Sequence, residues 1–479
     1  MVLGTTSGAG KSWLTTALCR YFARLGIKVA PFKAQNMSNN ARVVEGGEIG
    51  SAQYFQSLAA QAVPEVRMNP LLLKPERDTH SQVVLMGQVN QELTQMDWRG
   101  RSLKVWPQIA QALDELRASV DLVVIEGAGS PAEINLMDSD IVNMRVAQHV
   151  QAACLLVTDI DRGGAFAHLY GTWALLPEKD RALIRGFVLN RFRGDVALLA
   201  PGPQMLQDLT GVPTVATLPM WWQHGLPEED GVFDDRSRST GKVTQTIAVV
   251  AYPRISNLDE FQPLKNVPGV RLVWARTPAD LVGADWVILP GSKHTSGDLA
   301  WLRAQGLDAA VAAHAGQGGA VLGVCGGLQM LGEALIDPHE IDGNAPGLGL
   351  LPLVTVFEAE KTVKSTVSRF ASLGGAWQAL SGVEVQGYEI HHGQTAPHQA
   401  MRAAGDIAGE ALPNGLGWQN ARGNVLGVYI HGLFECPAVL MALFGATVPT
   451  LDTVFEGLAD FVDTHFLPRV LTSLLDVKP

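Results

Sequence analysis

A glycine-rich loop near the start of the chain constrains the fold more than any other feature. The residues Gly4-Thr-Thr-Ser-Gly-Ala-Gly-Lys11-Ser12 follow a short apolar run and open a segment with helical spacing. In this setting the backbone N–H groups of a helix start cradle phosphates, while a lysine neutralises phosphate charge and a serine reaches Mg²⁺. The loop therefore predicts a strand, a tight turn and a helix that bind ATP through Gly8, Gly10, Lys11 and Ser12.

The spacing of the glycines and the lysine indicates which class of phosphate-binding loop this is. The general pattern has four residues between the first Gly and the Gly-Lys pair, whereas five residues separate Gly4 from Gly10. This variant resembles the loop of dethiobiotin-synthetase-like enzymes. Partitioning and nitrogenase-type ATPases have an additional Lys where this chain has Thr6, so that class is disfavoured. Because few residues precede Gly4 for a first strand, we expect the N-terminus to be clipped or its start misassigned.

Side chains at the ends of apolar runs are candidates for metal and nucleotide binding. Glu126 ends the run Val120–Ile125, and open parallel sheets bind ligands at the carboxyl ends of their strands. Mg²⁺ takes carboxylate oxygens, so we predict Ser12, Glu48 and Glu126 as its ligands. A solvated loop acid is an almost equal interpretation of Glu48. Asn190 ends another apolar run, where its amide is placed to read an adenine edge.

The rest of the chain alternates short apolar runs with helical segments, which is typical of α/β domains with a doubly wound parallel sheet. The 479 residues exceed what one hydrophobic core accommodates. Expected strands lie at 120–125, 152–158, 184–189, 246–251, 270–275, 286–289 and 320–324, and expected helices at 12–25 and 108–117. We expect a phosphate-binding domain over 1–225, a polar linker over 226–245, a second α/β domain over 246–445 and a C-terminal helical segment over 446–479.

A cysteine between an apolar run and a helical segment marks the second domain. Cys325 follows Ala320–Val324 and is flanked by glycines, as at the strained turn that presents a nucleophile. The helix start after it favours the thiolate that attacks a carboxamide. His431, just past another apolar run, is the predicted base. Leu433 stands where many class I glutaminases have a Glu, so the group that orients His431 stays open, with Glu435 as the candidate.

Two further segments of this domain are less specific. The turn Leu289-Pro-Gly-Ser-Lys-His-Thr295 also ends an apolar run and offers backbone N–H groups to an oxyanion. The adjacent His391 and His392 resemble a metal site at first sight. Neighbouring residues of an extended segment point to opposite faces, so we expect these histidines to bind or pack rather than to share a metal.

Composition excludes several classes of partner. The net charge is −11 with no basic cluster, which argues against nucleic acid and anionic membranes. Four widely spaced cysteines form no disulfide pattern or zinc motif. The sequence has neither a signal peptide nor a long apolar run. We expect a soluble cytoplasmic protein with small-molecule partners; the oligomeric state stays open.

Over almost its whole length the chain resembles the cobyric acid synthase family, amidotransferases of cobalamin assembly. The likeness rests on Gly4–Ser12, Pro31–Met37, Gly47–Gly50, Asn69–Pro75, Asp159–Gly164, Pro290–Lys293, Gly326–Met330 and His431-Gly. It implies an ATP-dependent synthetase domain and a class I glutamine amidotransferase domain. The implied reaction is amidation of the b, d, e and g carboxylates of adenosylcobyrinic acid a,c-diamide, with glutamine as nitrogen donor. It also suggests corrinoid contacts at Lys33, Gln35, Asn36, Asp159, Asp161 and Arg162, for which turn structure is an equal interpretation.

Three alternatives remain at this point. Cobyrinic acid a,c-diamide synthase has the same two domains but resembles Gly-Pro-Asp-Tyr where this chain has Pro31–Met37. A relative that amidates a lipid-linked cell-wall precursor usually divides its functions between two chains. A nucleotide-gated regulatory protein with a vestigial glutaminase domain would not need Lys11, Cys325 and His431 intact.

Overall fold

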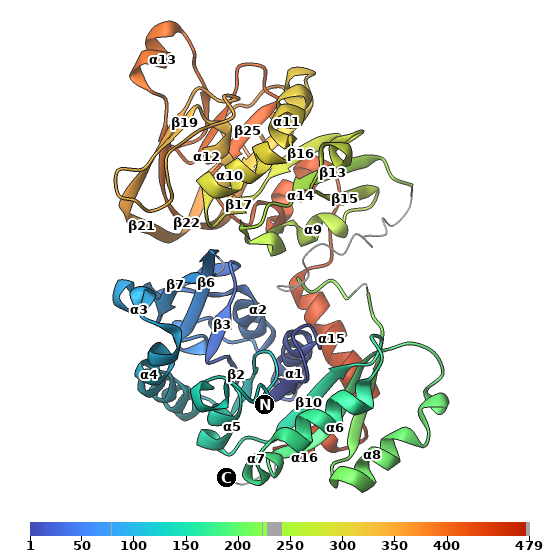
Figure 1. The fold of residues 1–479 in the computed structure, drawn as a ribbon. Coiled ribbons are helices and arrows are strands. Elements are labelled where there is room, and N and C mark those ends of the chain that lie inside the picture. Colours follow the sequence, from blue (N-terminus) through green and yellow to red (C-terminus); the bar gives the residue numbers. More distant parts are fainter. Residues whose placement is uncertain (78, 223, 228–241, 476–479) are drawn as a thin grey trace.

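The computed structural model describes residues 1–77, 79–222, 224–227 and 242–475 of the chain. Figure 1 shows two α/β bodies, one above the other, with the first half of the chain in the lower body. Most of the second half forms the upper body. The linker expected over 226–245 falls largely outside the described residues.

A parallel sheet forms the centre of the lower body. Its strands run in the order β1-β10-β11-β12, and β2 pairs in parallel with β9. A parallel bridge between Val2 and Glu126, the residue after β9, joins the two pieces. The strands are β1 (Val2–Gly4), β2 (Val29–Phe32), β9 (Leu122–Ile125), β10 (Cys154–Asp159), β11 (Ile184–Phe192) and β12 (Thr214–Pro219).

Helices cover both faces of this sheet. Leu155 and Val157 of β10 pack with α1 (Lys11–Arg24) on one face. Leu156 packs on the other face with α6 (Ala165–Leu175) and α8 (Gly202–Thr210). Successive side chains of a strand point to opposite faces, so a strand buried on both sides has a continuous apolar sequence. The doubly wound architecture is confirmed.

The side of the lower body that faces the upper body is built from shorter elements. A hairpin of β4 (Ala41–Val44) and β5 (Gly47–Gly50) leads into α2 (Ser51–Ala59). A second sheet beside it has the order β3-β6-β7-β8, backed by α4 (Trp98–Ser119). Its strands are β3 (Gln35–Met37), β6 (Leu71–Arg77), β7 (His80–Leu85) and β8 (Gln88–Val89).

The upper body contains a sheet in the order β15-β13-β16-β18-β25-β24-β23, parallel as far as β25 and antiparallel beyond it. The strands are β13 (Gln245–Val250), β15 (Val270–Ala275), β16 (Trp286–Leu289), β18 (Ala320–Val324), β23 (Gly409–Leu412), β24 (Gly417–Gln419) and β25 (Val425–Val428). A long antiparallel pair, β21 (Val354–Arg369) and β22 (Glu384–Ala396), extends toward the lower body (Figure 1). The predicted bounds of β15, β16 and β18 are confirmed.

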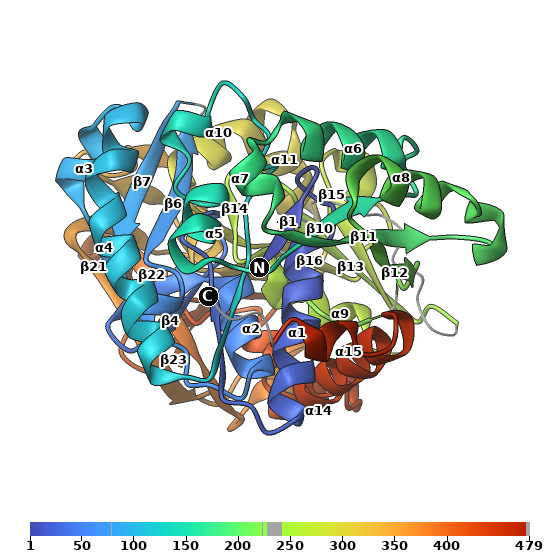
Figure 2. The same cartoon turned by 90° about the horizontal axis from the view of Figure 1, so that it is seen from below.

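The chain returns to the lower body at its C-terminal end. Helix α15 (Leu451–His465) lies beside α1 in both ribbon views (Figures 1 and 2). Its apolar face, with Phe455 and Leu458 fully buried, joins the core that contains Leu14 and Leu18 of α1. A helix was expected here, but its position against the first domain was not.

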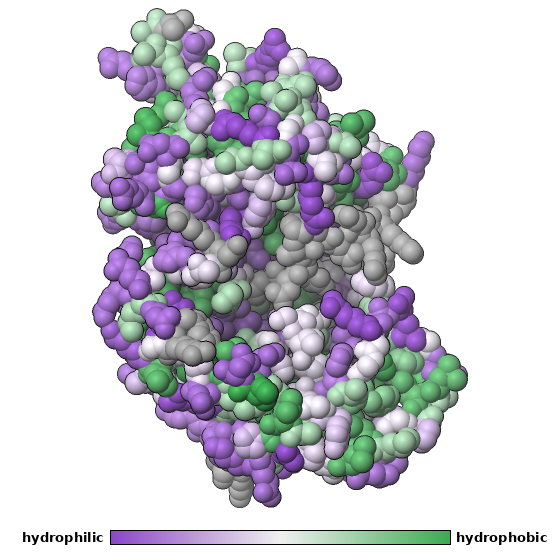
Figure 3. Space-filling model, viewed as in Figure 1, coloured by the Kyte–Doolittle hydropathy of each residue, from purple (hydrophilic) through white to green (hydrophobic). Residues whose placement is uncertain are grey.

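Most of the visible surface mixes polar and apolar side chains. Exposed apolar residues gather over α6, η3 (Val196–Leu199) and α8, at the lower right of Figure 3, and include Leu175, Val196, Leu198, Met205 and Leu209. None of the helices in the described ranges has both the length and the apolar character needed to cross a membrane.

Replacing Phe455 with alanine should destabilise the lower body. Deleting a buried aromatic ring costs about 3–5 kcal/mol in lost burial and cavity formation, and Phe455 is 2% exposed against α1. Urea unfolding followed by circular dichroism measures the change. The control is Leu467→Ala, which removes a side chain that is 53% exposed and should cost about 0.5 kcal/mol or less. Equal effects of the two substitutions would contradict the packing role of α15.

Candidate active sites

The phosphate loop lies between β1 and α1 and is held closed by a side chain from β11. Gly8 and Gly10 have positive φ angles of 71° and 99°. The amide of Asn190 donates to the carbonyl of Ala9 at 2.9 Å. A Cβ atom on Gly10 would lie 2.0 Å from that amide nitrogen, so only glycine fits there. Asn190 thus supports the loop, and its reading of an adenine edge stays a prediction.

Lys11 begins α1 and turns its ammonium group back over the loop. Its Nζ donates to the carbonyls of Thr6 at 2.9 Å and Gly129 at 3.2 Å. The side chain is buried. Fixed at a helix start among backbone dipoles, this cation is oriented to meet a phosphate group.

Glu126 is the buried charge beside the loop. Its Oε1 accepts from Ser12 Oγ and Lys33 Nζ, each at 2.8 Å, and its Oε2 accepts from Gln56 Nε2 at 2.5 Å. Burial raises the pKa of Glu126, but Lys33, Gln56 and Ser12 outweigh burial and hold the pKa below its usual range. The predicted pair Ser12 and Glu126 is therefore brought together. The sequence did not assign Lys33 or Gln56 to this carboxylate.

Glu48, the other predicted metal ligand, binds two lysines. Its carboxylate oxygens accept from Lys74 at 2.5 Å and Lys361 at 2.6 Å. Burial raises the pKa of Glu48, and the two ammonium groups reverse this and lower the pKa to about 2. Both lysines would have to move for Glu48 to bind a metal. Its role as a metal ligand stays a prediction.

The segment after β10 places one arginine near the loop. A Cβ atom on Gly8 would lie 4.0 Å from the guanidinium of Arg162, whose side chain is 71% exposed. Asp159 pairs with Arg191 at 3.0 Å, and Asp161 pairs with Arg193. Asp159 also pairs with Arg162 Nε at 3.4 Å. Both aspartates therefore have cationic partners within the chain, and the exposed guanidinium of Arg162 lies near the loop.

Cys325 occupies a strained turn between β18 and α12 (Gly326–Leu331). Its φ and ψ angles are 51° and −106°, outside the regions that L-residues favour. A Cβ atom on Gly327 would lie 1.8 Å from the carbonyl oxygen of Leu289, so glycine is needed for the helix to approach β16. The turn presents the thiol at the carboxyl end of the parallel sheet, as expected of a nucleophile.

His431 is fully buried beside this thiol and is oriented by Glu260. Its Nδ1 lies 2.9 Å from Glu260 Oε1, and the backbone N–H of Gly432 donates to Glu260 Oε2 at 2.9 Å. The other ring nitrogen makes the hydrogen bond with Cys325. Burial lowers the pKa of His431, but Glu260 and Cys325 outweigh burial and raise the pKa to about 10. An imidazolium stabilises a neighbouring thiolate.

The third member of this site is therefore Glu260, in η4 (Leu258–Phe261). Glu435 was the wrong expectation: it binds Arg42 at 2.6 and 2.8 Å. The turn after β16 meets the same site, since a Cβ atom on Gly291 would lie 2.9 Å from His431 Cε1. A Cβ atom on Gly326 would lie 2.8 Å from the Ser292 backbone nitrogen. The N–H groups of this turn are thus close enough to the elbow to serve an oxyanion.

Strand β22 lies between the Cys325 thiol and the lower body. Cys325 Sγ is 3.7 Å from the backbone carbonyl of Ile390 in β22. The side chain of Ile390 packs against a small apolar cluster of Ala41, Leu72 and Val84 in the lower body. The Cys325 thiol therefore lies close to the boundary between the two bodies.

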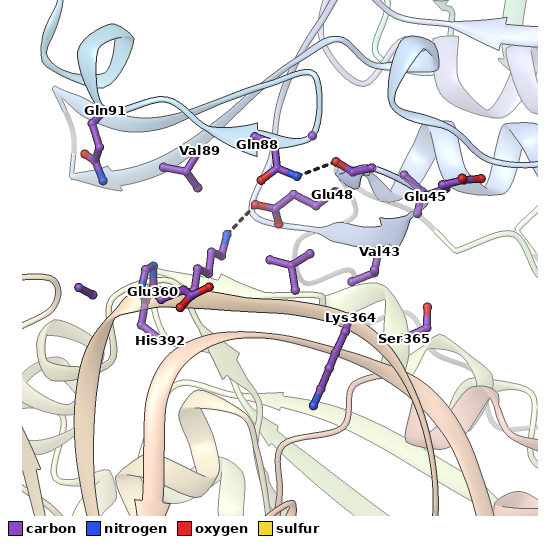
Figure 4. Close-up of a pocket in the computed structure, with 17 residues that line it drawn as sticks. Val43, Glu45, Glu48, Gln88, Val89, Gln91, Glu360, Lys364, Ser365 and His392 are labelled. Atoms are coloured by element: carbon purple, nitrogen blue, oxygen red, sulfur yellow. Dashed lines mark hydrogen bonds and ion pairs between the residues drawn. The ribbon is translucent and has the colours of Figure 1, made fainter.

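A cavity of about 730 Å³ lies at that boundary. Figure 4 shows the hairpin side chains Val43, Glu45 and Glu48 above it and side chains of β21 below it. His392 lines the cavity, while His391 is buried on the opposite face and stacks on Tyr429 at 4.0 Å. Neither Lys11 nor Cys325 lines this cavity. Within the described residues, no three His, Cys, Asp or Glu side chains are grouped to hold a metal.

Comparison with known proteins places a recognised domain on each body. A model described as the CobQ/CobB/MinD/ParA nucleotide binding domain matches residues 1–224, and one described as the CobB/CobQ-like glutamine amidotransferase domain matches residues 246–439. The chain is 78% identical over 478 residues to the cobyric acid synthase of Polaromonas naphthalenivorans (strain CJ2), covering 99% of each chain. It is also 78% identical over 475 residues to that of Variovorax paradoxus (strain S110), covering 99% of this chain and 98% of the relative. A solved structure titled "Crystal structure of glutamine amidotransferase" is 18% identical to this chain, with a TM-score of 0.31. The match covers 42% of this chain and 99% of that chain.

Glu260→Gln should move the alkaline limb of glutamine hydrolysis to lower pH. The substitution removes the charge that contributes most to raising the pKa of His431, so the imidazolium loses its proton at lower pH and the thiolate loses its counter-ion. Tyr388, stacked on His431, stays neutral in this range, since burial raises the pKa of its phenol well above the ordinary value. The profile of kcat/KM against pH measures the shift.

Glu435→Gln is the control for this profile, because Glu435 is a nearby carboxylate that binds Arg42 and not His431. The alkaline limb of the kcat/KM profile should not move in the Glu435→Gln variant. An unshifted limb in Glu260→Gln, or an equal shift in Glu435→Gln, would refute the assignment of Glu260.

Proposed function

The chain belongs to the cobyric acid synthase family, and we propose that it amidates four side-chain carboxylates of adenosylcobyrinic acid a,c-diamide. Family membership rests on 78% identity to a relative over 478 residues, together with the two matched domains. The enzyme is thus a glutamine-hydrolysing ligase that uses ATP. The proposed acceptors are the b, d, e and g carboxylates, and the product is adenosylcobyric acid.

One observation supports this function more than any other: a phosphate loop and a complete Cys-His-Glu site occur in one chain. Lys11, Ser12 and Glu126 meet at the first site. Cys325, His431 and Glu260 meet at the second. A carboxylate has to be activated before ammonia can displace one of its oxygens, so this reaction needs both an ATP site and an ammonia source.

At the second site, the thiolate of Cys325 attacks the side-chain carboxamide carbon of glutamine. The C–N bond then breaks, His431 gives its proton to the departing nitrogen, and ammonia leaves a glutamyl thioester. The turn around Gly291 offers N–H groups to the oxyanion formed in this step. Water, activated by the now neutral His431, hydrolyses the thioester to glutamate and restores the thiol. Glu260 keeps the imidazole oriented throughout.

At the first site, an oxygen of the corrinoid carboxylate takes the γ-phosphoryl group of ATP, which gives an acyl phosphate and ADP. Lys11 and the N–H groups of the loop stabilise the charge on the transferred group. Ammonia attacks the acyl carbon, loses a proton, and phosphate leaves. Mg²⁺ suits this corner, because Ser12 and Glu126 supply hard oxygen ligands and the buried carboxylate already requires a cation, Lys33, at 2.8 Å. When bound, the ion neutralises phosphate charge.

Other features agree with this proposal. Arg162 lies exposed beside the loop, where it can meet a corrinoid carboxylate or a phosphate. All four cysteines are free thiols, as is usual in a reducing compartment, so we place the enzyme in the cytoplasm. The small-molecule substrates are glutamine, ATP and the corrinoid.

The product distinguishes this proposal from its rivals. With ATP, Mg²⁺ and glutamine, adenosylcobyrinic acid a,c-diamide should gain four carboxamides, as measured by mass spectrometry after complete reaction. Cobyrinic acid a,c-diamide synthase would instead add two amides to cobyrinic acid and leave the diamide unchanged. Turnover of ATP and glutamine at equal rates with and without the corrinoid would exclude this substrate.

Substitutions at the two sites should separate the two half-reactions. Cys325→Ala should reduce glutamine-dependent synthesis by about 10³-fold or more, because the nucleophile is lost, while synthesis with ammonium chloride continues. Lys11→Ala should stop synthesis from either nitrogen source and leave glutamine hydrolysis measurable. Each variant is the control for the other. Glutamine-dependent synthesis by Cys325→Ala would contradict the proposed nucleophile, and a regulatory protein would show no synthesis in any arm.

A further inference from the structure

The β4–β5 hairpin of the lower body binds the element that carries Glu260. The backbone N–H of Ala41 donates to Asn257 Oδ1 at 2.8 Å, and the backbone N–H of Leu258 donates to Asn40 Oδ1 at 3.0 Å. Asn257 is the residue before η4 and has a positive φ of 53°. These reciprocal bonds hold the start of η4 against the other body, one turn from the carboxylate that orients His431.

Arg42, the next residue of the hairpin, is buried at this contact. Its guanidinium binds Asp259 of η4 and makes two bonds to Glu435, at 2.6 and 2.8 Å. The arginine and Asp259 side chains are 3% and 1% exposed. Its guanidinium also lies 5.1 Å from the ring centroid of Tyr388. A buried arginine in this geometry compensates two carboxylates of the other body.

Each of these three partners adjoins a residue of the His431 site. Asp259 directly precedes Glu260. Tyr388 stacks on the His431 ring at 5.3 Å, and the two backbones bridge through His431 N and Tyr388 O at 2.9 Å. Glu435 ends η7 (Leu433–Glu435), which follows the Gly432 N–H bound by Glu260. Arg42 therefore contacts the surroundings of the catalytic histidine through three residues.

We propose that Arg42 is a positioning residue for glutamine hydrolysis: the synthetase body, through this side chain, sets the geometry of the Cys325-His431-Glu260 site. Without its guanidinium, Asp259 stays buried and loses its cationic partner, and Glu435 loses its two bonds, so that η4 is displaced. The same hairpin continues into α2, whose Gln56 binds Glu126 at the nucleotide site. The inference rests on the proposed function only for the glutaminase role of Cys325.

The test compares Arg42→Met, Arg42→Lys and Arg20→Met in the full chain. Arg20 is an equally buried arginine of the lower body that binds two carboxylates of α15, Asp452 and Glu456, away from η4. It controls for the loss of a buried arginine as such. Glutamine hydrolysis is measured without corrinoid as kcat and KM, and synthesis is measured separately with ammonium chloride.

Arg42→Met should lower kcat for glutamine by about 10- to 100-fold, the cost of misplacing a catalytic group, with KM and ammonium-dependent synthesis changed by about twofold at most. Arg42→Lys should recover part of kcat, since it restores the charge but not the two-pronged bond. Arg20→Met should keep kcat within about twofold.

An unchanged kcat in Arg42→Met, an equal fall in Arg20→Met, or a parallel loss of ammonium-dependent synthesis would overturn the proposal. Failure of the proposed function is a different result: the unaltered enzyme would not amidate the corrinoid, although glutamine hydrolysis could still respond to Arg42.

Discussion

The burial of Arg42 among carboxylates of the opposite body is the constraint on which the meeting of the two halves depends. A buried charge is tolerated only when it is paired, and here Asp259 and Glu435 provide the pairing. Together with the reciprocal bonds of Asn40 and Asn257, this contact sets how η4 lies against the hairpin. The position of the Cys325 turn relative to the lower body follows from that arrangement, because Ile390 contacts both the thiol and the same face of the lower body.

Both sites are built on one physical plan. A glycine-rich turn at the carboxyl end of a parallel strand presents Lys11 in one body and Cys325 in the other. In each body, a fully buried carboxylate from another segment orients a polar side chain of the site. Glu126 binds Ser12, and Glu260 binds His431. Because each carboxylate has partners for both oxygens, breaking either arrangement would leave a buried charge without full compensation. These contacts therefore hold the reacting groups in place before substrate arrives.

The sequence predicted the features that depend on local pattern. Glycines with positive φ, an apolar run and a helix start lie within a few residues, so the loop at Gly4–Ser12, the Cys325 turn and strands such as Val270–Ala275 could be located. Glu260 could not be located in this way, because it lies 171 positions from His431 and in sequence resembles an ordinary surface acid. The same holds for Gln56 beside Glu126 and for α15 on α1. Tertiary packing determines which residues become such partners, and a single sequence does not reveal that packing.

The proposed function requires ammonia to pass from Cys325 to the activated carboxylate, and we propose that it does so inside the molecule. Incubation with amide-¹⁵N-labelled glutamine in a large excess of unlabelled ammonium chloride, followed by mass spectrometry of the corrinoid product, tests this transfer directly. Internal transfer predicts that the new carboxamides carry far more glutamine nitrogen than the isotope ratio of the bulk ammonium contains, although free ammonium is also accepted at the first site. Carboxamides whose isotope ratio follows the bulk ammonium would contradict the account, because the two sites would then exchange ammonia through solvent.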